Sequence, residues 1–174
     1  GSSGGEAALI SAGCSPVGIG SDAGGSIRQP AHYAGICGHK PTQNFIPNTG
    51  NAPVDGSGLL AQLICVGPMA RHVDDLNLIM EIIAGADNID PHCPPVKYRN
   101  TQEVDLKELK AAYFFNHKNT IPTPETTEAL KAVIQALTPE IKSIQEDFPK
   151  QCENIHALHM EPFFYGGDKG NGFK

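Results

Sequence analysis

The chain has 174 residues, of which 40% are hydrophobic and 18% are charged, as expected for a globular protein with a buried core rather than a disordered chain. The formal net charge of -6, without a basic stripe, argues against nucleic acid as the main partner, because phosphate binding needs clustered lysine and arginine. The five cysteines are scattered and form no C-x-x-C pair, which indicates a reduced, intracellular setting and no zinc site.

The first predicted element is a helix over residues 6–13, which are rich in helix formers and end at a glycine. Residues 16–20 follow as a short buried strand that leads into a glycine-rich loop. A single helical turn is expected over residues 30–35, with Pro30 at its first position, where a missing N–H is tolerated. Residues 41–58 are rich in Pro, Gly and Asn and are predicted to form a long loop.

The next stretch predicts one strand and the most regular helix of the chain. An apolar run over residues 59–66 suits a strand or a buried helical turn, which Gly67 and Pro68 should end. Residues 73–85 are predicted to form an amphipathic helix, because apolar side chains recur three and four positions apart before a closing glycine. Residues 87–100 contain several prolines and are predicted to be a loop.

The last third of the chain predicts a strand, a helix and a second strand. A buried strand is expected within residues 106–116, and a short strand within residues 139–148. Between them, Thr123 should cap a helix that runs to about Leu137. Residues 166–174 are rich in glycine and lysine and are expected to fray. Strands that alternate with helices indicate an α/β fold.

The glycine-rich loop over residues 18–30 is the candidate functional site, and three kinds of site could use its glycines. A dinucleotide site is the least favoured, although Gly18, Gly20 and Gly24 follow a predicted strand. Pyrophosphate binding needs a helix that begins at the loop. Here the acidic Asp22 lies inside the loop, and a proline interrupts its continuation.

A Ser-His-Asp hydrolase is the second alternative, with Ser26 as nucleophile and His32 or His39 as base. The nucleophile elbow of many such enzymes has the pattern G-x-S-x-G, which this loop lacks. Histidines of a triad are also seldom such close sequence neighbours of their serine. We therefore interpret both histidines as structural or surface residues.

The third alternative is a serine nucleophile that works without histidine. The N–H groups of residues 23–26 are consecutive and carry little side-chain bulk, so they could stabilise an oxyanion beside Ser26. Such a serine needs a base, and a neutral lysine can serve, in some enzymes through a second serine. Ser2 and Ser3, in another glycine-rich segment, are the candidates for this relay.

Several blocks of the sequence resemble the amidase signature enzymes. The blocks are residues 1–6 (GSSGGE), 18–30 (GIGSDAGGSIRQP), 35–42 (GICGHKPT), 67–71 (GPMAR) and 74–76 (DDL). Their order, the spacing between the serines and the G-x-K-P element match the family, strongly in the first half of the chain. The match also excludes the alternative that the opening residues derive from an expression tag.

The resemblance implies an α/β fold in which a mixed, twisted β-sheet is layered by α-helices. Because the family fold is much larger than this chain, we expect residues 1–174 to be one partial amidase domain, truncated at the N-terminus and at the C-terminus. Its signature core would span residues 1–42. Residues 46–50 and Pro53 look most like the fatty-acid amide hydrolase 2 branch, and the amidotransferase A subunits are the nearest rival.

The resemblance assigns the chemistry to two serines. Ser26 would be the nucleophile that forms an acyl-enzyme. Ser2, after a cis peptide bond with Gly1, would pass a proton between Ser26 and a lysine. The oxyanion hole would consist of four backbone N–H groups, those of Ala23, Gly24, Gly25 and Ser26.

Three further residues would support the two serines. Asp22 and Arg28 would pair behind the loop and brace it, and Ser3 would hydrogen-bond in the same network. The family's catalytic lysine lies upstream of Ser2, where this chain has no residue. The first lysine present, Lys40, has a structural role in the family. We therefore expect the chain alone to have little or no amidase activity.

The resemblance implies a serine hydrolase that cleaves carboxylic amides, in the first place fatty-acyl amides. The alternatives are an amidotransferase A subunit, which acts in glutamyl-tRNA amidation with a partner protein, and a catalytically inactive fragment. We expect a lipid-like small-molecule substrate, an intracellular location and no cofactor or metal. No apolar run reaches the ~18 residues of a membrane span. Membrane association through an upstream segment and a homodimer are left open.

Overall fold

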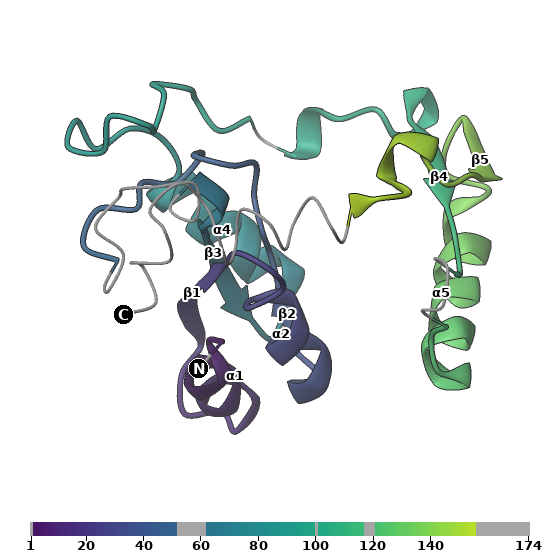
Figure 1. Ribbon diagram of the computed structural model, residues 1–174, viewed down its shortest axis with the longest axis horizontal. Coiled ribbons are helices and arrows are strands. Elements are labelled where there is room, and N and C mark those ends of the chain that lie inside the picture. Colours follow the sequence, from purple (N-terminus) through teal and green to yellow (C-terminus); the bar gives the residue numbers. More distant parts are fainter. Residues whose placement is uncertain (1, 52–61, 100, 117–120, 156–174) are drawn as a thin grey trace. The chain divides into compact units, whose positions relative to one another are not determined.

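The computed structural model describes residues 2–51, 62–99, 101–116 and 121–155. Among these residues the chain forms two compact units, one up to Thr101 and the other from Gln102 onward (Figure 1). The expectation of one partial domain over the whole chain stays a prediction. None of the helices in the described ranges is long and apolar enough to cross a membrane.

The first unit contains a small antiparallel sheet with helices packed against it (Figure 1). Its strands are ordered β1-β3-β2, with Val17 opposite Ala70 in the β1–β3 pair and Cys37 opposite Ala70 in the β2–β3 pair. In chain order, its elements are α1 (Gly4–Ser11), β1 (Val17–Asp22), α2 (Arg28–Ala34), β2 (Cys37–Gly38), β3 (Cys65–Ala70) and α4 (Val73–Ile83).

The predicted first helix, first strand and amphipathic helix are confirmed as α1, β1 and α4. In α4, Leu76 and Met80 are buried, and α4 contacts β3. The predicted loops are confirmed over residues 41–51 and 87–99, which contain no helix or strand. Residues 52–58 and the tail over residues 166–174 lie outside the described part of the chain.

Helix α2 begins at Arg28, so the prediction that Pro30 occupies its first position is wrong. The backbone N–H groups of Ile27 and Arg28 donate to the carboxylate of Asp22, which satisfies donors that a helix start leaves free. Pro30 is the third residue of the helix. A missing N–H is still harmless there, because the first turn has no intrahelical partners for its N–H groups.

Gly67 and Pro68, which were expected to end the apolar run, lie inside β3. The His39 N–H donates to the Pro68 carbonyl at 3.0 Å, so the backbone polar groups of Pro68 face β2, where the pairing stops. On the other side Pro68 lies opposite Ile19, and that ladder needs no N–H from it. A Cβ on Gly67 would overlap the His39 carbonyl oxygen, so only glycine fits. The prediction failed because the direction of the missing N–H decides whether proline interrupts a sheet.

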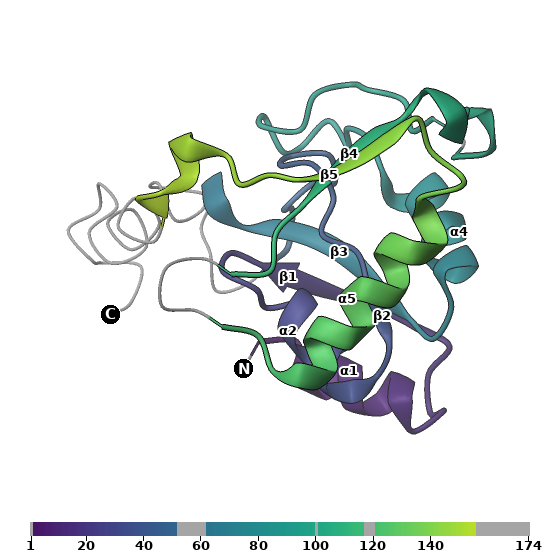
Figure 2. The ribbon, with the colours of Figure 1, turned by 90° about the vertical axis from the view of Figure 1, so that its right-hand side faces the viewer.

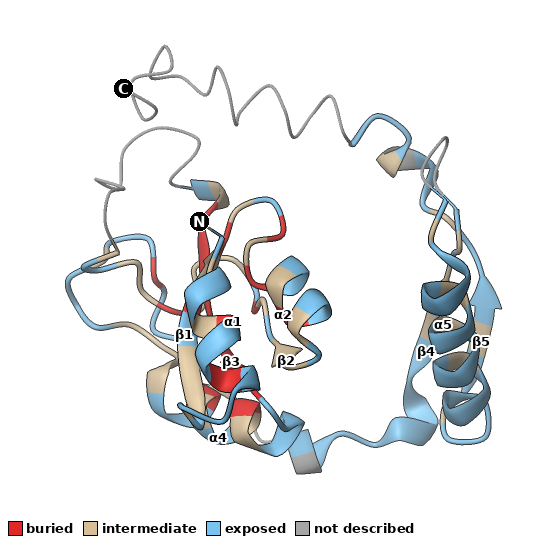
Figure 3. Cartoon of the chain, turned by 90° about the horizontal axis from the view of Figure 1, so that it is seen from below, coloured by how far each residue is buried: buried red, intermediate tan, exposed pale blue. Residues whose placement is uncertain are grey.

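The core of the first unit joins α1, α2 and β3. Ile10, Ile27 and Met69 are each 0% exposed and form one cluster with Ala7 and Ala31. Figure 3 shows buried segments on β3 and further ones on α4, where Leu76 and Met80 are buried. This cluster fixes the two segments that precede α1 and α2, and those segments carry the candidate serines.

The second unit has two parallel strands, β4 (Lys110–Tyr113) and β5 (Ser143–Glu146), joined by helix α5 (Pro124–Leu137) (Figure 2). Parallel strands need such a crossover connection. The predicted helix and both predicted strands are present, but the expected burial of the first strand is wrong. No residue described in this unit is buried (Figure 3). Two strands and one helix are too few to enclose a strand on both faces.

Replacing Thr123 by alanine should destabilise α5 by about 1 kcal/mol. The Thr123 hydroxyl accepts the Thr126 N–H at 3.3 Å and thereby satisfies one free donor of the helix start. Hydrogen exchange of the α5 amides measures the change. Thr138→Ala is the matched control, because its hydroxyl only donates to the Ile134 carbonyl at the other helix end. Equal effects of the two substitutions would contradict the cap.

Candidate active site

Two serine hydroxyls that are distant in sequence meet at one edge of the first unit. Ser2 precedes α1, and Ser26 lies between β1 and α2. The Ser26 hydroxyl donates to the Ser2 Oγ at 3.3 Å. Ser2 is exposed and Ser26 partly exposed, so a substrate could reach both. The structure therefore brings together the two residues that the resemblance assigns to nucleophile and relay.

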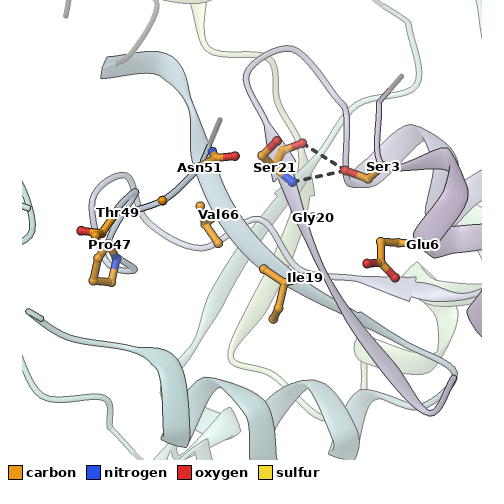
Figure 4. A pocket seen from close by; sticks show the side chains of 10 residues that line it. Ser3, Glu6, Ile19, Gly20, Ser21, Pro47, Thr49, Asn51 and Val66 are labelled. Carbon is orange, nitrogen blue, oxygen red and sulfur yellow. Dashed lines mark hydrogen bonds between the residues drawn. The ribbon is translucent and has the colours of Figure 1, made fainter. Parts of the chain in front are cut away.

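The segment that carries Ser2 is held in an unusual backbone conformation. Ser2 and Ser3 have φ angles of 41° and 52°, in the left-handed region that side chains other than glycine seldom adopt. Such strain persists only where surrounding contacts enforce it, and it is common at functional sites. Here the Ser3 hydroxyl accepts the Ser21 N–H at 3.2 Å and donates to the Ser21 carbonyl at 3.4 Å (Figure 4). Ser3 thus fastens this segment to β1.

The loop that carries Ser26 is organised around the buried carboxylate of Asp22, which is 0% exposed. Its Oδ1 accepts the Gly25 N–H at 2.7 Å, and its Oδ2 accepts the Ile27 N–H at 3.1 Å and the Arg28 N–H at 3.3 Å. The Arg28 guanidinium adds two bonds to the same carboxylate, at 2.9 and 3.0 Å. The loop is therefore tied to its own first residue on both sides of Ser26.

The protonation state of Asp22 follows from these contacts. Burial alone raises the pKa of the Asp22 carboxyl. The hydrogen bonds from the Arg28 side chain and from three backbone N–H groups together outweigh burial and hold the pKa well below its usual range. Asp22 is consequently an anion at neutral pH. No hydrogen bond among the described residues joins Asp22 to either serine hydroxyl, so its contacts hold the loop and do not place it as a base. Its supporting role in catalysis stays a prediction.

The four expected oxyanion donors differ in their surroundings. Gly25 has a φ of 125°, and a Cβ there would lie 2.9 Å from Nε2 of Gln29, so glycine is required. Its N–H is already engaged by Asp22. A donor that serves a carboxylate has little capacity left for an oxyanion. The roles of the other three N–H groups, those of Ala23, Gly24 and Ser26, stay predictions.

A base for the serine pair is not found among the described residues. No lysine, histidine or carboxylate of the described ranges hydrogen-bonds to the hydroxyl of Ser2 or Ser26. Lys40 Nζ contacts the carbonyl of the adjacent Pro41 at 3.5 Å. His32 is exposed and lies edge-on to the ring of Tyr33. The expected cis peptide bond after Gly1 lies outside the described residues.

A cavity of about 300 Å³ lies beside the Ser3–Ser21 contact (Figure 4). Its walls come from α1, β1, β3 and residues 47–51. The lining residues are Ser3, Glu6, Ile19, Gly20, Ser21, Pro47, Thr49, Gly50, Asn51 and Val66. The sequence patterns predicted no catalytic role for Gly20 or Ser21. A glycine inside a predicted strand, as at Gly20, often marks a place where another segment of the chain approaches the strand closely. This signal could have indicated that Ser3 contacts β1 there.

Comparison with known proteins places this geometry in a family. The amidase family model matches residues 1–163. Over 174 residues the chain is 41% identical to fatty-acid amide hydrolase 1 of Sus scrofa, a match that covers 97% of this chain and 30% of the relative. It is 42% identical to fatty-acid amide hydrolase 2 of Homo sapiens over 118 residues, 67% of this chain and 20% of the relative. The A subunit of glutamyl-tRNA(Gln) amidotransferase from Staphylococcus haemolyticus is 38% identical over 140 residues, 79% of this chain and 28% of the relative.

Solved structures agree with these sequence matches. A fatty acid amide hydrolase superposes with a TM-score of 0.75 at 28% identity, over 94% of this chain and 29% of that one. The glutamyl-tRNA(Gln) amidotransferase A subunit from Thermotoga maritima superposes with a TM-score of 0.77 at 27% identity, over 92% of this chain and 35% of that one. The chain thus spans at most 30% of the length of the curated relatives named above. Both the predicted resemblance and the predicted mixed helix-and-sheet fold are confirmed, and the chain belongs to the amidase signature family.

Proposed function

We propose that this chain supplies the nucleophile and the proton relay of a serine hydrolase that cleaves carboxylic amides. The observation that carries the proposal is the 3.3 Å hydrogen bond from the Ser26 hydroxyl to the Ser2 Oγ. A hydroxyl at ordinary pKa is a weak nucleophile, and an acceptor already aligned with its proton is the first requirement for activating it. Membership of the amidase signature family supports the same assignment.

In the proposed reaction, Ser26 Oγ attacks the amide carbonyl carbon while its proton passes to Ser2, whose own proton passes to a lysine. The carbonyl oxygen becomes an oxyanion, which the proposed N–H donors of the loop stabilise. The C–N bond then breaks as Ser2 delivers a proton to the leaving amine, and an ester remains on Ser26. Water hydrolyses that ester by the same relay. The lysine would come from outside the described residues.

We further propose that the substrate is a fatty-acyl amide and that the protein works inside the cell. The substrate assignment is supported by the fatty-acid amide hydrolases among the relatives. An amidotransferase A subunit is the second candidate, favoured by the match to the Thermotoga maritima protein, with its TM-score of 0.77. A partner protein that co-purifies with the full-length gene product would favour the transferase. Hydrolysis of a fatty-acyl amide without any partner would favour the hydrolase.

Labelling with a fluorophosphonate tests the proposal, because this probe reacts with activated serines. In the full-length gene product we expect one labelled site, Ser26, and no labelling of the Ser26→Ala variant. A labelled Ser26 would exclude the third alternative, a catalytically inactive protein. Failure to label a folded full-length protein would contradict the proposed function.

Residues 1–174 expressed alone should show no measurable amide hydrolysis, because no base of the described residues reaches either hydroxyl. The measurement is turnover of an acyl amide by the purified chain, with the full-length gene product as the positive control. Turnover by residues 1–174 that Ser26→Ala removes would show that a base lies within this chain.

A further inference from the structure

Gly20 lies directly beneath the contact that holds the relay segment. It is buried in β1, one residue before Ser21, whose backbone binds the Ser3 hydroxyl (Figure 4). A Cβ at this position would lie 2.8 Å from Ser3 Oγ, 2.9 Å from Ile27 Cγ1 and 3.0 Å from Met69 Sδ. The strand backbone at Gly20 is one that any residue adopts. Glycine is therefore required at this position by the lack of space for a side chain, and not by the backbone conformation.

We propose that Gly20 is a positioning residue of the amide hydrolysis: the space where its side chain would be receives the Ser3 hydroxyl and thereby holds Ser2 against Ser26. This inference rests on the proposed function. Ser3 bonds both to the N–H and to the carbonyl of Ser21, so its hydroxyl must lie flat against β1 next to Gly20. Any side chain at Gly20 would lift Ser3 off the strand.

A displacement of Ser3 passes directly to Ser2, its covalent neighbour. Both residues are in the left-handed region, where few alternative backbone angles are available to absorb a shift. The Ser26–Ser2 distance of 3.3 Å is already longer than the usual O–H···O length of about 2.7–2.8 Å. A further separation of a few tenths of an ångström would break the bond. Even a small displacement of Ser3 would therefore break the hydrogen bond between Ser2 and Ser26.

A second route from Gly20 to the site runs through the core. Ile27, which is 0% exposed, follows Ser26 directly, so a clash with its side chain could move Ser26 without involving Ser3. The two routes can be separated, because only the first needs the Ser3 hydroxyl. Removing that hydroxyl should abolish the effect of a side chain at Gly20 if the first route operates.

The test is a double-mutant cycle of Gly20→Ala and Ser3→Ala in the full-length gene product, with kcat and KM for a fatty-acyl amide as readouts. Gly20→Ala alone should lower kcat by about 10- to 100-fold and change KM by less than about 3-fold, since a misplaced relay slows chemistry and leaves binding intact. In the Ser3→Ala background, Gly20→Ala should lower kcat by less than about 3-fold.

Gly18→Ala is the matched control in the same strand. Its Cβ would point to the same face and would meet the Glu6 carboxylate at 2.6 Å and the terminal carbon of the Ile10 side chain at 3.2 Å. The end of the partly exposed Glu6 side chain can swing away, so kcat should stay within about 3-fold of wild type. If Gly20→Ala does not fold, the cycle is run in a Met69→Leu background, which removes the sulfur that a Cβ would meet at 3.0 Å and keeps the volume of the core.

Equal losses of kcat in both backgrounds, or no loss from Gly20→Ala, would overturn the inference. A wild-type protein without Ser26-dependent turnover would instead overturn the proposed function. In that case crystal structures of wild type and Gly20→Ala decide the positioning claim. A longer Ser2–Ser26 separation in the variant supports it, and an unchanged separation refutes it.

Discussion

Replacing Ser26 by alanine should lower amide hydrolysis by about four to six orders of magnitude in the full-length gene product. The substitution removes Oγ, the atom proposed to form the acyl-enzyme, and leaves the loop intact, since the Ser26 side chain hydrogen-bonds only to Ser2 among the described residues. Turnover of a fatty-acyl amide and mass detection of the acyl-enzyme measure the effect. The thermal stability of the variant should stay close to that of wild type.

The control for this substitution is Ser11→Ala, because Ser11 is exposed near the end of α1 and donates to the Ala8 carbonyl of its own helix. Its kcat should match wild type. Ser2→Ala should also reduce kcat strongly, and the double variant with Ser26→Ala should be no worse than Ser26→Ala alone, since residues of one relay act as a unit. Undiminished turnover by a folded Ser26→Ala protein would disprove the nucleophile assignment.

Replacing Asp22 by alanine should lower the free energy of unfolding by about 3–5 kcal/mol. The loss arises mainly because three backbone N–H groups that donate to the Asp22 carboxylate lose their acceptor. Two of these groups belong to buried residues, Gly25 and Ile27. The ion pair contributes less, because the Arg28 side chain is 56% exposed and stays hydrated after the change. Denaturant unfolding measures the difference, and Asp22→Asn, which keeps one acceptor oxygen, should lose less.

Asp74→Asn is the control, since this exposed carboxylate in the first turn of α4 interacts with the helix dipole and should change the free energy of unfolding by less than about 1 kcal/mol. Fluorophosphonate labelling of Ser26 should fall in the Asp22 variants even under conditions where they remain folded, because the loop loses its brace. An Asp22→Ala protein as stable as wild type would show that the loop is held by something other than this carboxylate.

The same residue predicts how stability depends on pH. The pKa of Asp22 is lowered by folding, so the unfolded chain binds more protons than the folded one near and below its own pKa of about 3.9. The contribution of Asp22 is therefore present at pH values above the unfolded pKa, decreases progressively as the pH falls below that value, and is lost completely once the pH has fallen through the folded pKa. Unfolding midpoints measured from pH 3 to pH 6 should drop more steeply for wild type than for Asp22→Asn.

Much of the fold was predictable because local patterns carried it. Apolar side chains at helical spacing identified α4, and Thr123 was correctly assigned as the cap of α5. Predictions from local sequence patterns failed where the structure of a segment depends on the strands or helices beside it. Pro68 was expected to stop a strand, yet its missing N–H faces the side where β2 ends. The strand β4 was expected to be buried, but it is not. The burial of a strand depends on which elements cover it, and this cannot be read from the strand's own residues.

The sequence alone determined the chemistry that this chain can offer: a serine at the end of a glycine-rich loop, a second serine near the start, and an Asp–Arg pair that flanks the first. Motif order and spacing were enough to identify the amidase signature family. Only the tertiary structure decided that the Ser26 and Ser2 hydroxyls lie 3.3 Å apart, and that Ser3 rests in the space beside Gly20. The reason is physical: residue types set which bonds can form, whereas distances between segments far apart in sequence are set by how α1, α2 and β3 pack around one core.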